Sequence, residues 1–269
     1  MRERDRGRRA RARLLGEHRP HRVVAPHAIS AAIECSSASR DSTVVRGATM
    51  TIPSTFWLSR SAMNVPIVAA QGDPRSASGI PVASVNQEAG ARMVLEHLIR
   101  RGHRRILHVA GPPDWNDAQL RLRAYQAQLK EAELPSSPPL FGDWTSDSGF
   151  EIGRALTRGT ASCSRTELPF TAVFSANDQM ALGLIHALRV AGLDVPRDIS
   201  VEGFDDIPES AHFWPPLTTV RQDFGSLGAR CVAMLLDAIG REEVLAAPEA
   251  SISPVVEPQL SIRDSVASV

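Results

Sequence analysis

Polar side chains follow two short, buried-type strands in the stretch 172–206, AVFSANDQMALGLIHALRVAGLDVPRDISVEGFDD. Asn177 comes directly after the first apolar run and offers both a hydrogen-bond donor and an acceptor. Asp205 closes the second run, and a carboxylate in that place can accept hydrogen bonds from two adjacent hydroxyls of a sugar. A helix cap or a turn would use the same residue types, but we favour ligand binding for both residues.

The segment between these two residues predicts the structure that positions them. An amphipathic helix spans about 179–191, with Gly192 at its C-terminal stop. A strand, a helix and a second strand within about thirty residues form a βαβ unit, which implies parallel strands joined by a right-handed crossover. The carboxyl ends of both strands then meet at the edge where open α/β sheets bind ligands. We assign the neighbouring carboxylates to structure, Asp178 as the cap of this helix and Asp206 within the turn.

From residue 64 onward, the chain alternates between short apolar runs and amphipathic stretches with the helical period. This alternation predicts an α/β fold with parallel sheets. The expected strands are 65–70, 82–85, 105–110, 140–144, 172–175, 199–204 and 217–220, with an edge-type tail at 251–263. Besides 179–191, the expected helices are 88–101 (capped by Asn86), 117–132, 148–157 and 224–240.

The composition bounds the class of protein. The chain has 269 residues, 43% of them apolar, which is enough for a substantial core. Its formal net charge is zero, so the total charge indicates neither a nucleic-acid binder nor an acidic-surface protein. No apolar run approaches the roughly 18 residues of a membrane span, and the basic start lacks the apolar segment of a secretory signal. Three cysteines without a CxxC pair fit a reducing compartment, so we expect a cytoplasmic protein that does not contact membranes.

Residues 1–62 differ from the rest of the chain. Arginine dominates the run 2–13, and the stretch 25–51 has neither a period of 2 nor one of 3.6. We expect this basic segment to be disordered. Two alternatives remain open: a basic arm that contacts phosphates with salt-sensitive affinity, and a mis-called start that replaced a genuine N-terminal domain.

The sequence carries none of the common catalytic or nucleotide-binding signatures. It has no GxSxG, GxxxxGK[ST] or HExxH motif, and the turn 111–113 lacks the glycines that let a backbone approach a pyrophosphate. His97, His103 and His108 are expected on a helix, in a turn and in a strand, so they should not converge on a metal ion. We therefore expect no catalytic residue, no metal site and no cofactor.

Five motifs resemble those of one family of bacterial regulators. In order along the chain they are EHLIRRGHRRILHVAGP at 96–112, GDWTSDSGF at 142–150, ANDQMALG at 176–183, DISVEGFDD at 198–206 and PPLTTVRQDFGSLG at 215–228. Any one of them would be a weak signal, but all five occur at the spacing of the family. By these motifs, the region 63–264 resembles the effector-binding core of the LacI/GalR family of transcription regulators.

The resemblance implies a fold similar to that of periplasmic sugar-binding proteins. Two parallel-sheet subdomains would be joined by three crossovers, with a small effector between them. Subdomain one would comprise 64–111 and 224–240, and subdomain two would comprise 112–222 and 250–264. The first strands and helices of the family's N-terminal subdomain have no counterpart in this sequence, so we expect subdomain one to be incomplete.

The resemblance also implies the residues of the effector site. Arg121 would contact the effector through its guanidinium, and Trp144 would stack on the apolar face of a pyranose. Taken alone, a solvated helix arginine and a core tryptophan would be the alternative interpretations. Gln71 stands where a relative has an aspartate, and we assign it no role. The resemblance also places a polar contact, Gln222, and a wall residue, Phe224, at the second crossover. Together these residues indicate that the effector is a sugar or similar polyol, with a nucleobase as the second choice. The expected ligand-binding residues are Arg121, Trp144, Asn177, Asp205, Gln222 and Phe224.

By this resemblance, the chain is the sugar-sensing core of a transcriptional repressor. In intact family members, effector binding changes how paired DNA-binding headpieces sit on an operator. Nothing in 1–62 resembles the family's helix-turn-helix headpiece, so we expect a truncated chain that forms a homodimer but does not recognise operator DNA. Two alternatives come from other classes: a solute-binding protein of a sugar transporter, which would need an export signal, and an enzyme on the same scaffold.

Overall fold

The structure of the protein is a computed structural model. It describes residues 44–47, 67–72, 80–158, 168–239 and 253–269. Most of the segment 1–62 lies outside these ranges, and with it most of the region for which we expected disorder. Within that segment, β1 (Val44–Gly47) is a strand that pairs in parallel with β2 (Ile67–Ala70), which differs from the expected lack of regular structure.

The larger of two sheets has six strands in the order β10-β8-β7-β6-β4-β5. Adjacent strands in this sheet run parallel, except that β10 pairs antiparallel with β8. The predicted βαβ unit is its centre, where β6 and β7 pair side by side and β4 lies on the other side of β6. The strands are β4 (Ile106–Ala110), β5 (Leu140–Phe141), β6 (Ala172–Ser175), β7 (Ser200–Asp205), β8 (Thr218–Arg221) and β10 (Gln259–Ser261).

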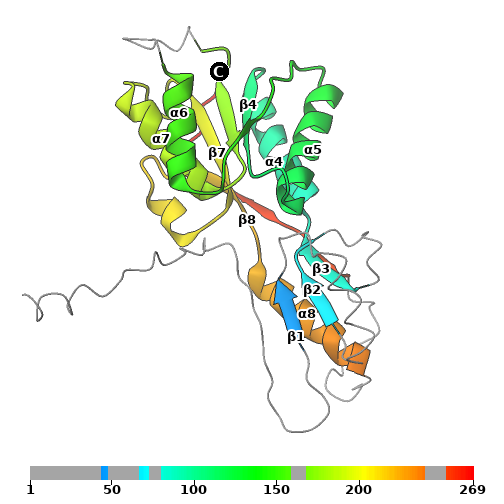
Figure 1. The fold of residues 1–269 in the computed structure, drawn as a ribbon. Coiled ribbons are helices and arrows are strands. Elements are labelled where there is room, and N and C mark those ends of the chain that lie inside the picture. Colours follow the sequence, from blue (N-terminus) through cyan, green and yellow to red (C-terminus); the bar gives the residue numbers. More distant parts are fainter. Residues whose placement is uncertain (1–43, 48–66, 73–79, 159–167, 240–252) are drawn as a thin grey trace, which may run out of the picture.

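Four helices cover this sheet in two layers, as Figure 1 shows. On one face lie α4 (Gln87–Arg100) and α5 (Asn116–Glu131), and on the other α6 (Ser146–Leu156) and α7 (Asp178–Val190). Alternate residues of each strand supply the two cores, because successive side chains of a strand point to opposite faces. In β4, for example, Ile106 packs in the core beneath α4 and α5, whereas Leu107 packs in the core beneath α6 and α7.

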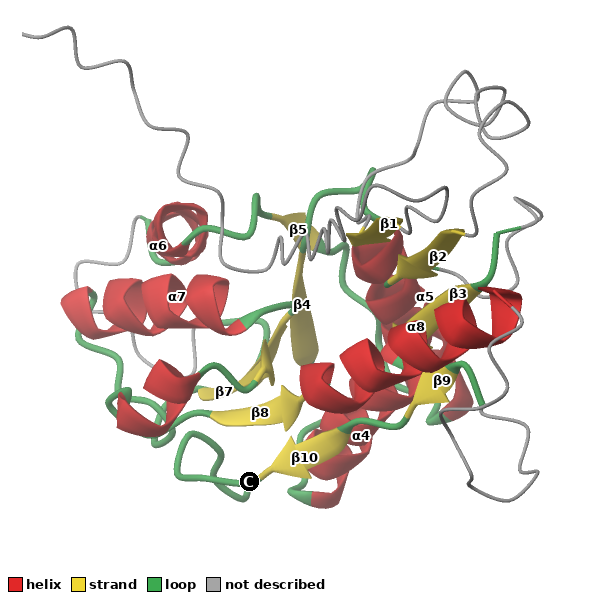
Figure 2. Cartoon of the chain, turned by 90° about the horizontal axis from the view of Figure 1, so that it is seen from below, coloured by secondary structure: helices red, strands yellow, loops and turns green. Residues whose placement is uncertain are grey.

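The smaller sheet has four parallel strands in the order β1-β2-β3-β9, which include β3 (Val82–Val85) and β9 (Val255–Val256). The helix α8 (Phe224–Ile239) packs along this sheet, as Figure 2 shows. Its apolar side supplies Leu227, Cys231 and Leu235, all buried against β2, β3 and β9. Among the described residues, this unit has four strands and one helix, which agrees with the expected incomplete subdomain.

Strand pairing divides the chain differently from the subdomain boundaries that we expected. The range 64–111 was placed in subdomain one, but β4 pairs with β5 and β6 of the larger sheet, and α4 packs on that sheet too. Similarly, 250–264 was placed in subdomain two, yet β9 pairs with β3 of the smaller sheet. The chain passes between the two units three times, after β3, after β8 and between β9 and β10. The number of crossovers therefore matches the expectation, but the first lies near Asn86, not at residue 111.

The local elements agree closely with the expected ones, with one exception. Asn86 caps α4 as predicted, since its Oδ1 accepts a hydrogen bond of 3.0 Å from the backbone N–H of Ala89. The strand expected at 140–144 ends at Phe141 instead. The backbone of Trp144 adopts a left-handed conformation with φ of 75°, which no regular strand accommodates.

A buried histidine in the larger sheet predicts a pH-dependent stability. His108 lies in β4, where its Nδ1 donates a hydrogen bond of 3.0 Å to the carbonyl of Phe174, and its Nε2 has no partner among the described residues. Burial lowers the pKa of His108 from 6.5 to about 4. The folded-state pKa therefore lies below the unfolded value, so the stability present above pH 6.5 is lost as the pH falls towards 4.

We expect His108→Phe to remove this dependence. Relative to the variant, the wild-type protein should lose about 3 kcal/mol of unfolding free energy between pH 7 and pH 4. Phenylalanine should fit, because the imidazole already stacks on the ring of Phe174 with 4.5 Å between centroids. Urea denaturation of both proteins across this pH range measures the difference, and parallel pH profiles would contradict the prediction.

Candidate functional site

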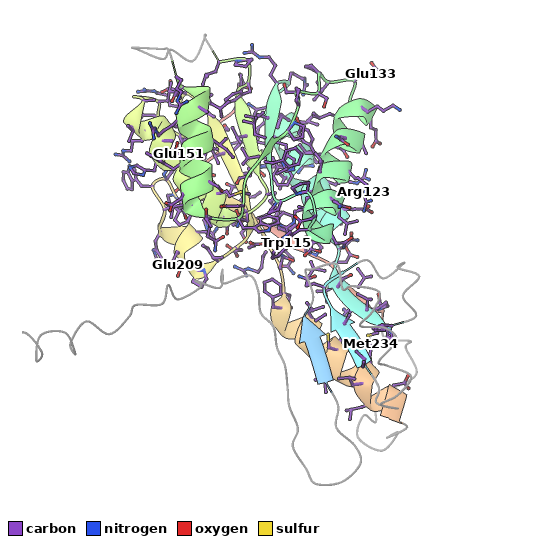
Figure 3. The ribbon with its side chains drawn as sticks, viewed as in Figure 1. Trp115, Arg123, Glu133, Glu151, Glu209 and Met234 are labelled. Atoms are coloured by element: carbon purple, nitrogen blue, oxygen red, sulfur yellow. The ribbon has the colours of Figure 1, made fainter. Side chains whose placement is uncertain are left out.

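A small cavity lies where the two units meet, at the carboxyl ends of β2, β7 and β8. This is the edge at which open parallel sheets bind ligands. Figure 3 shows Trp115 at the end of the larger unit that faces the smaller one. The cavity has a volume of about 40 Å³, and its lining residues are Gln71, Trp115, Asp117, Arg121, Trp144, Asp205, Gln222 and Phe224.

Arg121 is the cation of this cavity, and its donors are directed by fixed acceptors. It lies one turn into α5 and is buried, whereas Arg123 on the same helix is exposed and points outward in Figure 3. Its Nε donates to Oε1 of Gln87 at 2.9 Å, one terminal nitrogen donates to the carbonyl of Ala176, and the other lies 3.7 Å from Oδ1 of Asp205. Burial lowers the pKa of the Arg121 guanidinium, and the charge of Asp205 opposes this. The guanidinium is therefore held in one orientation before any ligand arrives.

Gln222 connects the two units. Its amide nitrogen donates to Oδ1 of Asp205 at 2.7 Å in the larger unit. Its oxygen accepts from Gln87 at 2.9 Å and from Gln71, at the end of β2 in the smaller unit, at 3.3 Å. The polar groups of the cavity thus form a chain of hydrogen bonds from Arg121 across the crossover, and a change at Asp205 reaches both units.

Aromatic side chains form the apolar wall of the cavity. The rings of Trp115 and Trp144 meet edge to face, with 5.7 Å between centroids, and Phe224 at the start of α8 adds a third ring. Trp144 can lie against the end of β4 because residue 111 is glycine: a Cβ there would lie 2.1 Å from the indole ring. The indole Nε1 is buried and has no partner among the described residues, so a ligand oxygen could accept its hydrogen bond.

Left-handed backbone conformations concentrate around this cavity. Five residues other than glycine have a positive φ in the described ranges, and three of them line the cavity. These are Gln71 (φ 64°), Trp144 (φ 75°) and Asp205 (φ 116°). Such conformations are costly for residues with a Cβ and are found mainly where function requires them. Their concentration at the cavity makes it the candidate functional site independently of its chemistry.

The structure brings five of the six expected ligand-binding residues together and leaves one out. Asn177 does not line the cavity, since its buried side chain caps α7, and ligand binding by this residue stays a prediction. Its Oδ1 accepts from the backbone N–H of Met180 at 3.0 Å, and its Nδ2 donates to the carbonyl of Trp144 at 2.9 Å. Asn177 therefore holds the backbone of Trp144 in place. The residues that line the cavity as expected are Arg121, Trp144, Asp205, Gln222 and Phe224.

Asp178 and Asp206 are structural, although Asp178 is not the cap that we expected. Asp178 is the first residue of α7, where its carboxyl group accepts from Thr219 at 2.5 Å and from the backbone of Ile207 at 3.0 Å. Asp206 accepts from Arg221 and Arg263, each at 2.6 Å. Both carboxyl groups tie loops to the larger sheet, and neither residue lines the cavity.

Sequence reasoning missed three residues of the site. Asp117 precedes Arg121 by four positions, so the helical period alone would have placed both on one face. Gln87 and Trp115 gave no comparable signal. Gln87 is the first residue of α4 and Trp115 immediately precedes α5, so their positions indicated only helix boundaries. In the structure, Gln87 orients two other residues: it accepts a hydrogen bond from Arg121 and donates one to Gln222.

Comparison with known proteins gives the class of this fold and site. Residues 95–266 match the family described as periplasmic binding protein-like domain. The lactose operon repressor of Escherichia coli K12 is 39% identical over 159 residues, which cover 58% of this chain and 42% of the repressor. The transcriptional repressor PurR of Haemophilus influenzae (strain PittEE) is 37% identical over 183 residues, covering 67% of this chain and 52% of PurR. The crystal structure of the lac repressor dimer bound to operator and the anti-inducer ONPF superposes with a TM-score of 0.68 at 29% identity, covering 84% of this chain and 73% of that one.

The chain therefore belongs to the periplasmic binding protein-like family. Within this family, it carries the effector-binding core of a LacI/GalR-type regulator, as the five motifs indicated. The chain spans about half the length of the curated relatives that it matches.

Two further features are absent from the described residues. No helix in these ranges is long and apolar enough to cross a membrane. Nor do three or more His, Cys, Asp or Glu side chains gather there in an arrangement that could hold a metal ion.

Proposed function

We propose that this chain is the effector-sensing part of a transcriptional repressor, and that its cavity binds a sugar or a similar polyol. The observation that carries the proposal is the combination of Arg121, Asp205 and Gln222 with an aromatic wall in one cavity. Sites for sugars join a few fixed polar groups, which orient the hydroxyls, with apolar surface for the C–H face of the ring.

The size of the cavity indicates that binding requires movement. A volume of about 40 Å³ holds only a few water molecules, far less than a ligand pocket of about 300 Å³ or more. A sugar must therefore displace the hydrogen bond between Gln222 and Asp205 and separate the walls. Because Gln222 also contacts Gln71 in the smaller unit, opening the cavity would shift the two units relative to each other. Such a shift is the kind of change that could transmit occupancy to a second site.

The partners follow from the relatives. One structural neighbour is a lac repressor dimer bound to its operator, and the curated relatives are named as repressors. By analogy, we infer a cytoplasmic regulator that dimerises, with no catalytic activity. We assign operator recognition to none of the described residues.

Thermal unfolding of the full chain against a panel of mono- and disaccharides, polyols and nucleobases tests this function. A ligand present at 100 times its Kd should raise the Tm by about 5–10 °C. Isothermal titration then gives the affinity and stoichiometry. If no sugar or polyol shifts the melting curve while a nucleobase does, the proposed effector class is wrong.

A further inference from the structure

The cavity contains a second carboxyl group that none of the family motifs includes. Asp117 lies in the first turn of α5, four residues before Arg121, so both side chains face the same side of the helix. The residue is 7% exposed and lines the cavity together with Asp205. Two carboxyl groups therefore face the single guanidinium among the cavity-lining residues.

The guanidinium of Arg121 already has partners within the protein. Its three nitrogens are directed to Gln87, to the carbonyl of Ala176 and to Asp205, and the remaining lining residues are glutamines and aromatic rings. With both carboxyl groups ionised, the lining carries one positive and two negative charges. A ligand with its own negative charge would therefore meet no free cation in the cavity and would lie close to two acids, where burial leaves the repulsion poorly screened.

The state of Asp117 itself supports this view. Burial raises the pKa of its carboxyl group, Arg121 opposes this, and Asp205 adds to it. A carboxyl group in such surroundings resists ionisation first because it is buried and then because of the neighbouring negative charge. It can exchange hydrogen bonds with a hydroxyl in either protonation state, and it gains a favourable partner in an ammonium group. A carboxylate or phosphate of a ligand would instead add a further negative charge beside the two carboxyl groups.

We propose that Asp117 is a specificity-determining residue of the effector site, and that with Asp205 it makes the site select uncharged or cationic sugars over anionic ones. This inference rests on the proposed function and deepens it by naming the charge class of the effector. The site would accept neutral sugars and amino sugars, and it would reject uronic acids and sugar phosphates.

Matched ligands on one ring test the proposal. The sugar that binds best in the panel is compared with its amino and uronic acid derivatives, for example galactose with galactosamine and galacturonate, by titration calorimetry on the full chain. In the wild-type protein, we expect the uronate to bind at least 30-fold more weakly than the parent, and the amino sugar at least as tightly. In Asp117→Asn, the ratio of uronate to parent dissociation constants should fall at least fivefold.

Asp114→Asn is the matched control, because it removes the same charge from an exposed residue three positions earlier that does not line the cavity. Its charge preference should equal that of the wild type at 0.5 M salt, where surface charges are screened. Uronate binding as tight as that of the parent, or an unchanged ratio in Asp117→Asn, would overturn the role of Asp117 while the proposed function stands. If no sugar of any charge binds, the proposed function fails and this inference with it. Asp117→Ser keeps the test open should the asparagine variant fold poorly.

Discussion

Replacing Asp205 by asparagine is expected to weaken effector binding about 100-fold, because two hydrogen bonds from hydroxyls to a charged acceptor are lost or reversed. The carboxylate lies at the end of β7, 3.7 Å from Arg121 and 2.7 Å from the amide of Gln222. Asparagine keeps its shape, but it can accept through only one oxygen. Titration calorimetry with the best sugar of the panel measures the effect directly.

The neighbouring carboxylate provides the control. Asp206 has the same residue type and also has a left-handed backbone, but it does not line the cavity, and its side chain binds Arg221 and Arg263. Burial raises the pKa of Asp206, but hydrogen bonds from these two arginines and from Ser261 outweigh burial and hold this pKa below its usual value. Asp206→Asn should therefore lower the unfolding free energy by about 2 kcal/mol while changing affinity less than threefold. Equal loss of affinity in both variants would show that Asp205 acts through the fold and not through the ligand.

The pair of aspartates also shows what the sequence could establish about the site. The end of a strand in a βαβ unit is a geometric position, so periodicity alone placed Asp205 at the ligand edge. It could not decide between ligand and cap for Asn177, since both roles need a small polar residue directly after a strand. The structure shows the cap at Asn177, which also binds the Trp144 carbonyl, and it shows Asp205 lining the cavity.

The limits of fold prediction have a similar cause. Helices such as α4 and α5 follow from local periodicity and capping, and their bounds agree with the expected ones within one residue. Pairing between distant segments leaves no local trace. Val85 pairs with Val256, and nothing in either segment indicates that the tail returns to the smaller sheet before it joins the larger one. The cluster of Gln71, Gln87 and Gln222 depends on the same long-range contacts, which is why Gln87 was not anticipated.

A substitution outside the cavity lining should have the largest effect on stability. The helices α6 and α7 cross at Gly149 and Gly183, where their backbones touch. A Cβ on Gly183 would lie 1.8 Å from the carbonyl oxygen of Ser146 and 2.7 Å from the backbone nitrogen of Phe150. Backbone atoms cannot rotate away as a side chain can, so Gly183→Ala should force the helices apart and lower the unfolding free energy by about 3 kcal/mol or more. Helix propensity alone predicts the opposite, a gain of about 1 kcal/mol.

Gly228→Ala in α8 separates these two effects. It is also a helical glycine, but a Cβ there would meet no atom within 4 Å, so this variant should gain about 0.5–1 kcal/mol. Urea denaturation followed by circular dichroism compares the two variants with the wild type, and a neutral Gly183→Ala would contradict the close crossing. Because α6 follows directly after Trp144 and α7 begins at the cap that binds the Trp144 carbonyl, the same displacement should also move the aromatic wall. Folded Gly183→Ala protein should therefore bind the effector more weakly, although residue 183 does not line the cavity.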